Sequence, residues 1–250
     1  MDFLAKNYGG GYVAAVSALE DIREWITKDV EFENFLANDA KFREHQDGYT
    51  ADGFDYAIKV PKSKKPESKY FIREERVKGK NLTKWEELVS DGHDMKQISS
   101  LILKNYINQI MSGRVHSDVH IGNFCVTHDK KIAIFDRNFY LNLTQQDQGI
   151  IFSLIDSSEG FHERSTRLKQ YLGSESANWP DLANKEVDEM VLAMSKQKWN
   201  DVHGSLIKIK QMGVKIPLTL TLLLKNFNSL QVMARRAGFG DLMEAYSYQP

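Results

Sequence analysis

Residues 114–138 read RVHSDVHIGNFCVTHDKKIAIFDRN, and the interpretation of the whole chain begins from this stretch. Two short apolar runs, 124–127 and 132–135, flank the polar turn HDKK and predict an antiparallel hairpin. With all four turn residues in the loop, Phe124 is expected opposite Phe135. Polar residues then stand at the open end of the hairpin, where two strands bring them together.

In that register Asn123 lies opposite Asp136, with their Cβ atoms about 4.5–5.5 Å apart. An amide oxygen and a carboxylate suit Mg²⁺, which takes hard oxygen ligands together with phosphate and water. The order His116-x-Asp118, then Asn123, then Asp136 after a hairpin has the form of a kinase catalytic loop and its metal-binding aspartate. Turn and capping roles are the alternative, since Asp and Asn favour such places. Three such residues at this spacing favour the functional interpretation.

Composition sets limits on the class of protein. The 250 residues are 42% hydrophobic, enough to bury a sizeable core. A formal charge of -1 argues against a protein that mainly coats nucleic acid, and the single cysteine, Cys125, excludes an internal disulfide. No secretory signal is recognised at the start, and the most apolar segment, 215–233, is interrupted by polar residues such as Lys225. We expect a cytoplasmic protein without a membrane span, with peripheral membrane association left open.

Periodicity predicts an α+β chain with its strands grouped early. Strands are expected at 56–62 and 69–77, in addition to the hairpin. Helices are expected at 12–28, 32–42, 93–111, 144–155, 161–172, 181–198, 199–212 and 217–236. Thr144 is expected to cap the helix that ends at Ile155.

The catalytic-loop stretch resembles the UbiB/AarF/ADCK-type atypical kinases, whose loop reads H-A-D-P-H-P-G-N and is followed by D-F-G. The matching residues are His116, Asp118, His120, Gly122 and Asn123, while Val119 and Ile121 replace two prolines. Further matches are Asn38 and Phe42 at the end of an acidic helix, Glu75 and Gly79 in the E-y-x-x-G step, and 213–246 as C-terminal helices.

The resemblance implies a protein-kinase-like fold that binds ATP and Mg²⁺. A curtailed N-lobe with few strands would occupy residues 1–78, and a mainly helical C-lobe residues 79–250. Its implied activity is that of a phosphotransferase or ATPase linked to isoprenoid-quinone or lipid metabolism. By the same resemblance Asp118 is catalytic and Glu75, Asn123 and Asp136 bind the cofactor. The implied metal ligands are Asn123 and Asp136, and the implied structural loop residues are His116, His120 and Gly122.

Several family features are absent. The N-terminal K-x-G-Q signature, the alanine-rich nucleotide loop and the strand with the phosphate-binding lysine are missing, and Phe35 stands where the partner glutamate is expected. Lys59 lies in YAIKVPK, but the acidic helix precedes this strand, which is the wrong order for the kinase lysine. D-F-G has become Asp136-Arg137-Asn138. Arg137 is expected to be a surface charge or a minor phosphate contact, and Asn138 to replace glycine in a left-handed position.

Two other functions are weighed. The missing lysine and loop favour a pseudokinase or a truncated fragment that acts as a binding module. A metal-dependent hydrolase would use His116, Asp118 and His120, because alternate residues of an extended segment share a face. The expected partners are a nucleotide, a lipid or small-molecule acceptor, and a protein that completes the N-lobe.

Overall fold

The structure is a computed structural model that describes residues 23, 32–64, 73–137, 140–155, 159–174 and 179–250. Apart from residue 23, the expected helix at 12–28 lies outside the described residues, as does Asn138. Two compact units are present. Lys28–Leu143 and Leu222–Pro250 form one, here called the site unit, and Met1–Thr27 and Thr144–Thr221 form the other, the helical unit.

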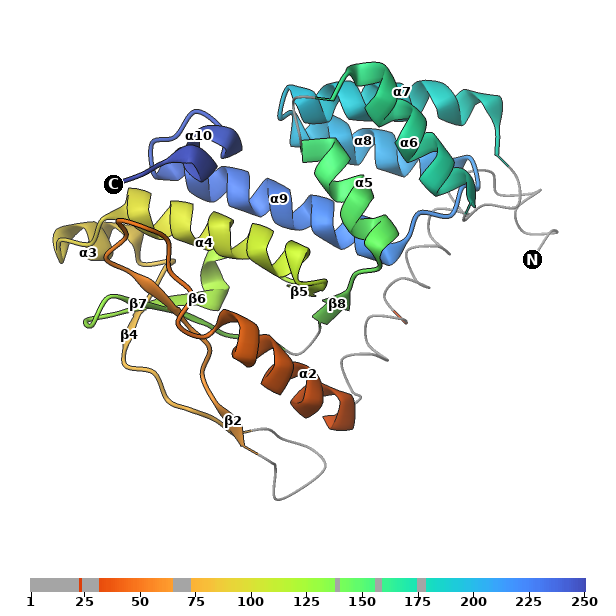
Figure 1. Ribbon diagram of the computed structural model, residues 1–250. Coiled ribbons are helices and arrows are strands. Elements are labelled where there is room, and N and C mark those ends of the chain that lie inside the picture. The colour runs from red at the N-terminus through yellow and green to blue at the C-terminus, as the bar shows by residue number, and fades with distance from the viewer. Residues whose placement is uncertain (1–22, 24–31, 65–72, 138–139, 156–158, 175–178) are drawn as a thin grey trace. The chain divides into compact units, whose positions relative to one another are not determined.

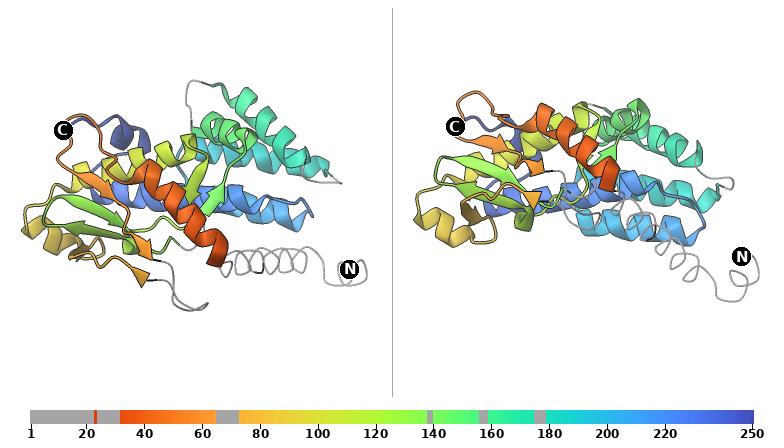
Figure 2. Two further views of the ribbon diagram at one scale, coloured as in Figure 1. Left: turned by 60° about the horizontal axis from the view of Figure 1, so that its bottom comes forward. Right: turned by 90° about the horizontal axis from the view of Figure 1, so that it is seen from below.

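A four-stranded sheet lies in the site unit, with the order β1 (Ala57–Lys59), β7 (Lys131–Ile134), β6 (Phe124–Thr127) and β4 (Gly79–Asn81). β1 is parallel to β7, and the other two pairs are antiparallel. Two further ribbons pair β2 (Ser63–Lys64) with β3 (Arg73–Glu74), and β5 (Arg114–His116) with β8 (Tyr140–Asn142). Figure 2 shows the sheet from two further sides.

The β6–β7 hairpin has a different register from the one expected. Phe124 lies opposite Ile134, not Phe135, so the pairing is displaced by one residue. The cause is the turn: the Lys130 N–H donates to the Thr127 oxygen at 3.1 Å, and Lys130 adopts a left-handed backbone with φ 55°. This is the three-residue hairpin loop, in which a type I turn is followed by a left-handed residue. Lys131 therefore belongs to the strand.

The displacement changes the open end of the hairpin. The Phe135 N–H donates to the Asn123 oxygen at 2.8 Å, so Phe135 occupies the place opposite Asn123 that was expected for Asp136. A one-residue change of register moves a side chain to the other face of a regular strand. Asp136, however, lies beyond the end of β7 and has a left-handed backbone with φ 53°, so the strand alternation does not apply to it.

The site unit also contains the helices α2 (Phe32–Gln46), α3 (Trp85–Ser90), α4 (Met95–Met111) and α10 (Leu242–Ser247), together with α9 (Leu218–Arg236) from Leu222 onward. α4 begins at Asp94, whose carboxylate accepts the N–H groups of Lys96 and Gln97. Within the unit, α4 and the later part of α9 run side by side (Figures 1 and 2), with the rings of Tyr106 and Phe227 5.6 Å apart.

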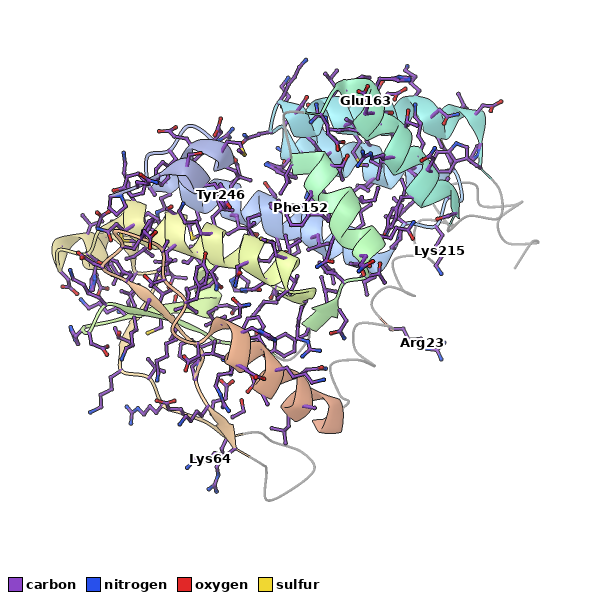
Figure 3. All side chains as sticks on the ribbon, in the orientation of Figure 1. Arg23, Lys64, Phe152, Glu163, Lys215 and Tyr246 are labelled. Atoms are coloured by element: carbon purple, nitrogen blue, oxygen red, sulfur yellow. The ribbon has the colours of Figure 1, made fainter. Side chains whose placement is uncertain are left out.

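The helical unit contains α5 (Gln145–Ile155), α6 (Phe161–Ser174), α7 (Asp181–Ser195) and α8 (Trp199–Gln211). Figure 3 labels Phe152 on α5 and Glu163 on α6. The Thr144 cap is confirmed: its hydroxyl accepts the Asp147 N–H at 3.1 Å, and the Asp147 carboxylate accepts the Thr144 N–H at 2.8 Å. The ends of these four helices lie within three residues of the ends that periodicity predicts.

The expected α+β class, with few strands and many helices, is confirmed. The expected lobe boundary between residues 78 and 79 stays a prediction, and it falls inside the site unit, where β1 and β4 share a sheet. None of the described helices combines the length and the apolar character that crossing a membrane requires.

Candidate functional site

The expected catalytic loop runs from β5 into the short 3₁₀ helix η1 (Ile121–Asn123), and His116 holds its start. The buried imidazole accepts the Asp118 N–H at Nδ1 (3.0 Å), while Nε2 lies 3.1 Å from the Phe135 oxygen. Because Nδ1 accepts a hydrogen bond, the ring proton is on Nε2, which donates to Phe135. One neutral ring thus joins the backbone of Asp118 to the residue that precedes Asp136.

Burial lowers the pKa of His116 to about 4, and the positive charge of Arg137 acts in the same direction. The Phe135 oxygen and the charges of Asp118 and Asp136 oppose this shift without cancelling it. The imidazole is therefore neutral at pH 7, as its two hydrogen bonds require.

Asn226 of α9 holds the same loop from the other side. Its Oδ1 accepts the Val119 N–H at 3.0 Å, and its Nδ2 lies 3.1 Å from the His116 oxygen and 2.9 Å from the Tyr106 hydroxyl. The side chain is fully buried. Since buried polar groups are costly when unpaired, these bonds fix the backbone on both sides of Asp118.

Asp118 is partly exposed and has two basic neighbours. Lys225 Nζ lies 2.6 Å from Oδ1, and His120 Nε2 lies 3.3 Å from Oδ2. Burial acts to raise the pKa of Asp118, but the hydrogen bond and charge of Lys225 outweigh it, and the pKa lies below its ordinary value. Asp118 is therefore ionised at neutral pH, in the form that accepts a hydrogen bond from a hydroxyl group.

Asn123 and Asp136 are the two expected metal ligands. Asn123 is buried, and its Nδ2 donates to the Asp118 oxygen at 2.9 Å, which orients the amide and keeps Oδ1 as the acceptor. Asp136 is exposed, beyond the end of β7. The described residues contain no group of three His, Cys, Asp or Glu side chains able to hold a metal. A kinase-type magnesium site does not need three such side chains, because phosphate and water complete the coordination of the metal. The amide oxygen of Asn123 and the carboxylate of Asp136 therefore fit Mg²⁺ by their donor chemistry.

His120 and Gly122 form a small turn at the start of η1. The His120 Nδ1 accepts the Gly122 N–H at 3.0 Å. A Cβ atom at position 122 would lie 2.7 Å from the His120 ring, so a larger residue there would displace this ring from its present position. The hydrolase hypothesis is not supported, because both nitrogens of His116 are already hydrogen-bonded and cannot join His120 around a metal.

The expectation for Arg137 is wrong, because this side chain is fully buried rather than at the surface. Its guanidinium lies 2.9 Å from Asp39 on α2 and 2.9 Å from Glu74 on β3. It also donates to the backbone oxygens of Pro61, at 2.8 Å, and of Ile134. A guanidinium with these four partners is not available to bind phosphate.

Glu75 lies in a different environment from the catalytic loop. Its Oε1 pairs with Lys59 Nζ at 2.9 Å, and its Oε2 accepts the Lys62 N–H at 3.2 Å. The cofactor role of Glu75 stays a prediction, and Lys59 is paired with it.

The glycine at position 79 has a clear structural reason. A Cβ atom there would lie 2.4 Å from the Val126 oxygen, so only glycine allows β4 to approach β6.

Two residues of this site were not expected from the sequence, Lys225 and Asn226. In the sequence they merely interrupt an apolar segment. The interruption itself could have indicated their role in the site, since a lysine and an asparagine in the middle of an otherwise apolar helix usually have a polar partner.

Known proteins were compared with the chain. The family model described as the ABC1 atypical kinase-like domain matches residues 4–162. Among solved structures, that of a Rv3197–erythromycin complex from Mycobacterium tuberculosis is similar, with a TM-score of 0.52 at 16% identity. The similarity covers 88% of this chain and 57% of that one, so this chain spans little more than half of the other. At this identity the similarity shows the fold alone. No curated protein sequence matches the chain.

Proposed function

The chain belongs to the ABC1 atypical kinase-like family, and from this premise we propose that it is an ATP- and magnesium-dependent phosphotransferase or ATPase. The observation that carries the proposal is the buried His116 ring, which binds the backbone at Asp118 and at the residue before Asp136. One neutral ring thus fixes the backbone at the two positions to which the proposal assigns the reaction.

Each residue has a separate part in this proposal. Asp118, ionised and partly exposed, accepts a hydrogen bond from the hydroxyl or water that attacks the terminal phosphate and orients it. Asn123 and Asp136 hold Mg²⁺, which when bound neutralises charge on the phosphates. His116 and Asn226 position the loop, and neither reaches the reacting atoms.

The phosphate acceptor that we propose is a small molecule or lipid of isoprenoid-quinone metabolism. Support for this comes from the family resemblance of the catalytic loop.

A pseudokinase is the second candidate, and the buried pairs of Arg137 favour it. Arg137 is buried and bound to Asp39 and Glu74, so it is not available for phosphate, and Lys59 is paired with Glu75 rather than with a residue of the catalytic loop. A protein that binds a nucleotide weakly, or not at all, needs neither.

Isothermal titration with ATP, in the presence and absence of magnesium, tests the proposal. We expect binding that depends on magnesium, and Asp136→Asn is expected to weaken it about tenfold or more. Asn tolerates the left-handed backbone, so this change removes the charge without straining the chain. The matched control is Asp55→Asn, because Asp55 is an exposed aspartate that pairs with Lys130 on the same hairpin.

Absence of binding at millimolar ATP would overturn the enzyme proposal and leave the pseudokinase. Binding that is equal with and without magnesium, or unchanged by Asp136→Asn, would overturn the metal role of the hairpin.

A further inference from the structure

The proposed reaction needs a positive charge at the terminal phosphate. In phosphoryl transfer, negative charge is spread over the oxygens of the transferred group and is stabilised by metal ions, lysine and arginine. Arg137 is fully buried among its partners, and Lys59 pairs with Glu75, which is not part of the catalytic loop. Another cation of the site unit lies beside the catalytic loop.

Lys225 is that cation. Its ammonium group lies 2.6 Å from the Asp118 Oδ1, directly beside the carboxylate that is proposed to orient the attacking oxygen. An ammonium has three N–H donors, and among the described residues only Asp118 is found as an acceptor for it. The side chain is 47% exposed, so the remaining donors are open to a ligand.

The pair differs from an ordinary surface ion pair, because the helix that carries it is tied to the loop. Asn226 follows Lys225 in α9, is fully buried, and binds the backbone at His116 and Val119, the two positions that flank Ser117 and Asp118. Neighbouring residues of one helix thus fix the loop and place the charge. Exposed ion pairs between flexible side chains have no such constraint and contribute little.

From this geometry we infer that Lys225 binds the terminal phosphate of the nucleotide, so that α9 brings a positive charge to the catalytic loop. The inference deepens the proposed function and rests on it. An attacking oxygen hydrogen-bonded to Asp118 lies about 3 Å from that carboxylate, and so does the ammonium. The oxygens of the phosphate under attack are then within reach of the long, flexible lysine side chain. Asp118 holds the ammonium in place until the phosphate arrives.

The ligand class follows from this position. Lys225 contacts the group that is transferred, so it distinguishes a nucleoside triphosphate from a diphosphate. A lysine with a structural role alone makes no such distinction.

The experiment compares the affinity of ADP with that of AMP-PNP, a non-hydrolysable triphosphate, by isothermal titration of the full chain with magnesium. Lys225→Met keeps the aliphatic stem and removes the charge, and Lys225→Arg restores a charge. The matched control is Lys131→Met: Lys131 is also 47% exposed and pairs with Asp129 at 2.7 Å, away from the catalytic loop. Thermal unfolding of each variant checks that it is folded.

We expect the wild type and Lys131→Met to bind AMP-PNP about tenfold more tightly than ADP, a difference of about 1.4 kcal/mol. Lys225→Met should lose this preference while its affinity for ADP stays within about twofold of the wild type. Lys225→Arg should recover part of the preference for AMP-PNP over ADP.

Other outcomes overturn the inference in distinguishable ways. If the wild type binds neither nucleotide, the proposed function fails and the inference with it. A triphosphate preference that survives in Lys225→Met overturns the inference alone. Equal loss of both ligands assigns Lys225 a structural role, and tighter binding of both means that the Lys225–Asp118 pair blocks the site.

Discussion

At the scale of single residues, His116 and Asp136 set the shape of the site. The His116 ring is neutral and fully buried, and both of its nitrogens bond to backbone groups, at Asp118 and Phe135. Asp136 has a positive φ of 53°, which non-glycine residues rarely adopt outside turns and functional sites. Both features can be tested by substitution, without knowledge of any ligand.

The first prediction concerns pH and His116. Its pKa is about 4 in the folded protein against an ordinary value of 6.5, so between these values the unfolded chain binds a proton that the folded chain does not. The free energy of unfolding should therefore fall as the pH drops from 6.5 towards 4, by about 3 kcal/mol from this residue. Above pH 6.5 the contribution is constant. Urea denaturation at several pH values measures this fall in the free energy of unfolding.

His116→Asn is the comparison for this measurement, because its Oδ1 can accept the Asp118 N–H and it does not titrate. The variant should be less stable at pH 7, with a shallower decline of stability in acid. An equal decline in both proteins would contradict the assignment of a buried, neutral imidazole.

The second prediction concerns the backbone of Asp136. Asn tolerates a left-handed conformation, whereas a β-branched residue is strained there. Asp136→Val should therefore lower the free energy of unfolding by about 1–2 kcal/mol relative to Asp136→Asn, since both changes remove the same charge. Equal stability of the two variants would show that position 136 has an ordinary backbone in solution.

At the scale of elements, Arg137 joins segments that are distant in the sequence. Its guanidinium pairs with Asp39 on α2 and Glu74 on β3, while the Tyr140 hydroxyl of β8 donates to the same Asp39 at 2.9 Å. The two-stranded β2–β3 ribbon is too short to be stable by itself. The buried charges therefore hold α2 and β3 against the end of the hairpin.

The third prediction is that Arg137→Met lowers the free energy of unfolding by about 3–5 kcal/mol, because two carboxylates lose their buried partner. Arg236→Met is the matched control: Arg236 pairs with Glu86 at the surface and should cost about 1 kcal/mol or less. Chemical denaturation of both variants provides the comparison. Similar small losses in both would mean that Arg137 is accessible to water.

At the scale of the whole molecule, the site unit is made of two segments of the chain, Lys28–Leu143 and Leu222–Pro250. The second segment completes the catalytic loop, because Asn226 bonds to Val119 across 107 positions of the sequence. The conformation of the loop therefore depends on contacts with the second segment.

The fourth prediction follows from this closure. Asn226→Leu removes the partners of the Val119 N–H and the His116 oxygen, and should lower the free energy of unfolding by about 2 kcal/mol or more. Hydrogen exchange should become faster at the Val119 amide. Asn200→Leu, at an exposed position in the helical unit, is the control and should leave this amide protected. Unchanged protection in Asn226→Leu would contradict the role of α9 in holding the loop.

The sequence by itself was sufficient for the α+β class, for the helices from α5 to α9 and for the cap at Thr144. These features depend on local patterns, namely the 3.6-residue period and short-range side-chain bonds to the backbone. The order of His116, Asp118, Asn123 and Asp136 also led to the kinase-like family, because the chemistry of a catalytic loop needs these residue types at this spacing.

Only the tertiary structure decided the hairpin register, the burial of Arg137 and the place of Lys225. The register depends on one left-handed residue, Lys130, which a polar turn of four residues does not specify. Arg137 and Lys225 each find their partners far away in the sequence, Asp39 98 positions and Asp118 107 positions away. Periodicity and motif spacing describe only near neighbours along the chain, whereas the cost of burying an unpaired charge is settled by whatever the fold places beside it.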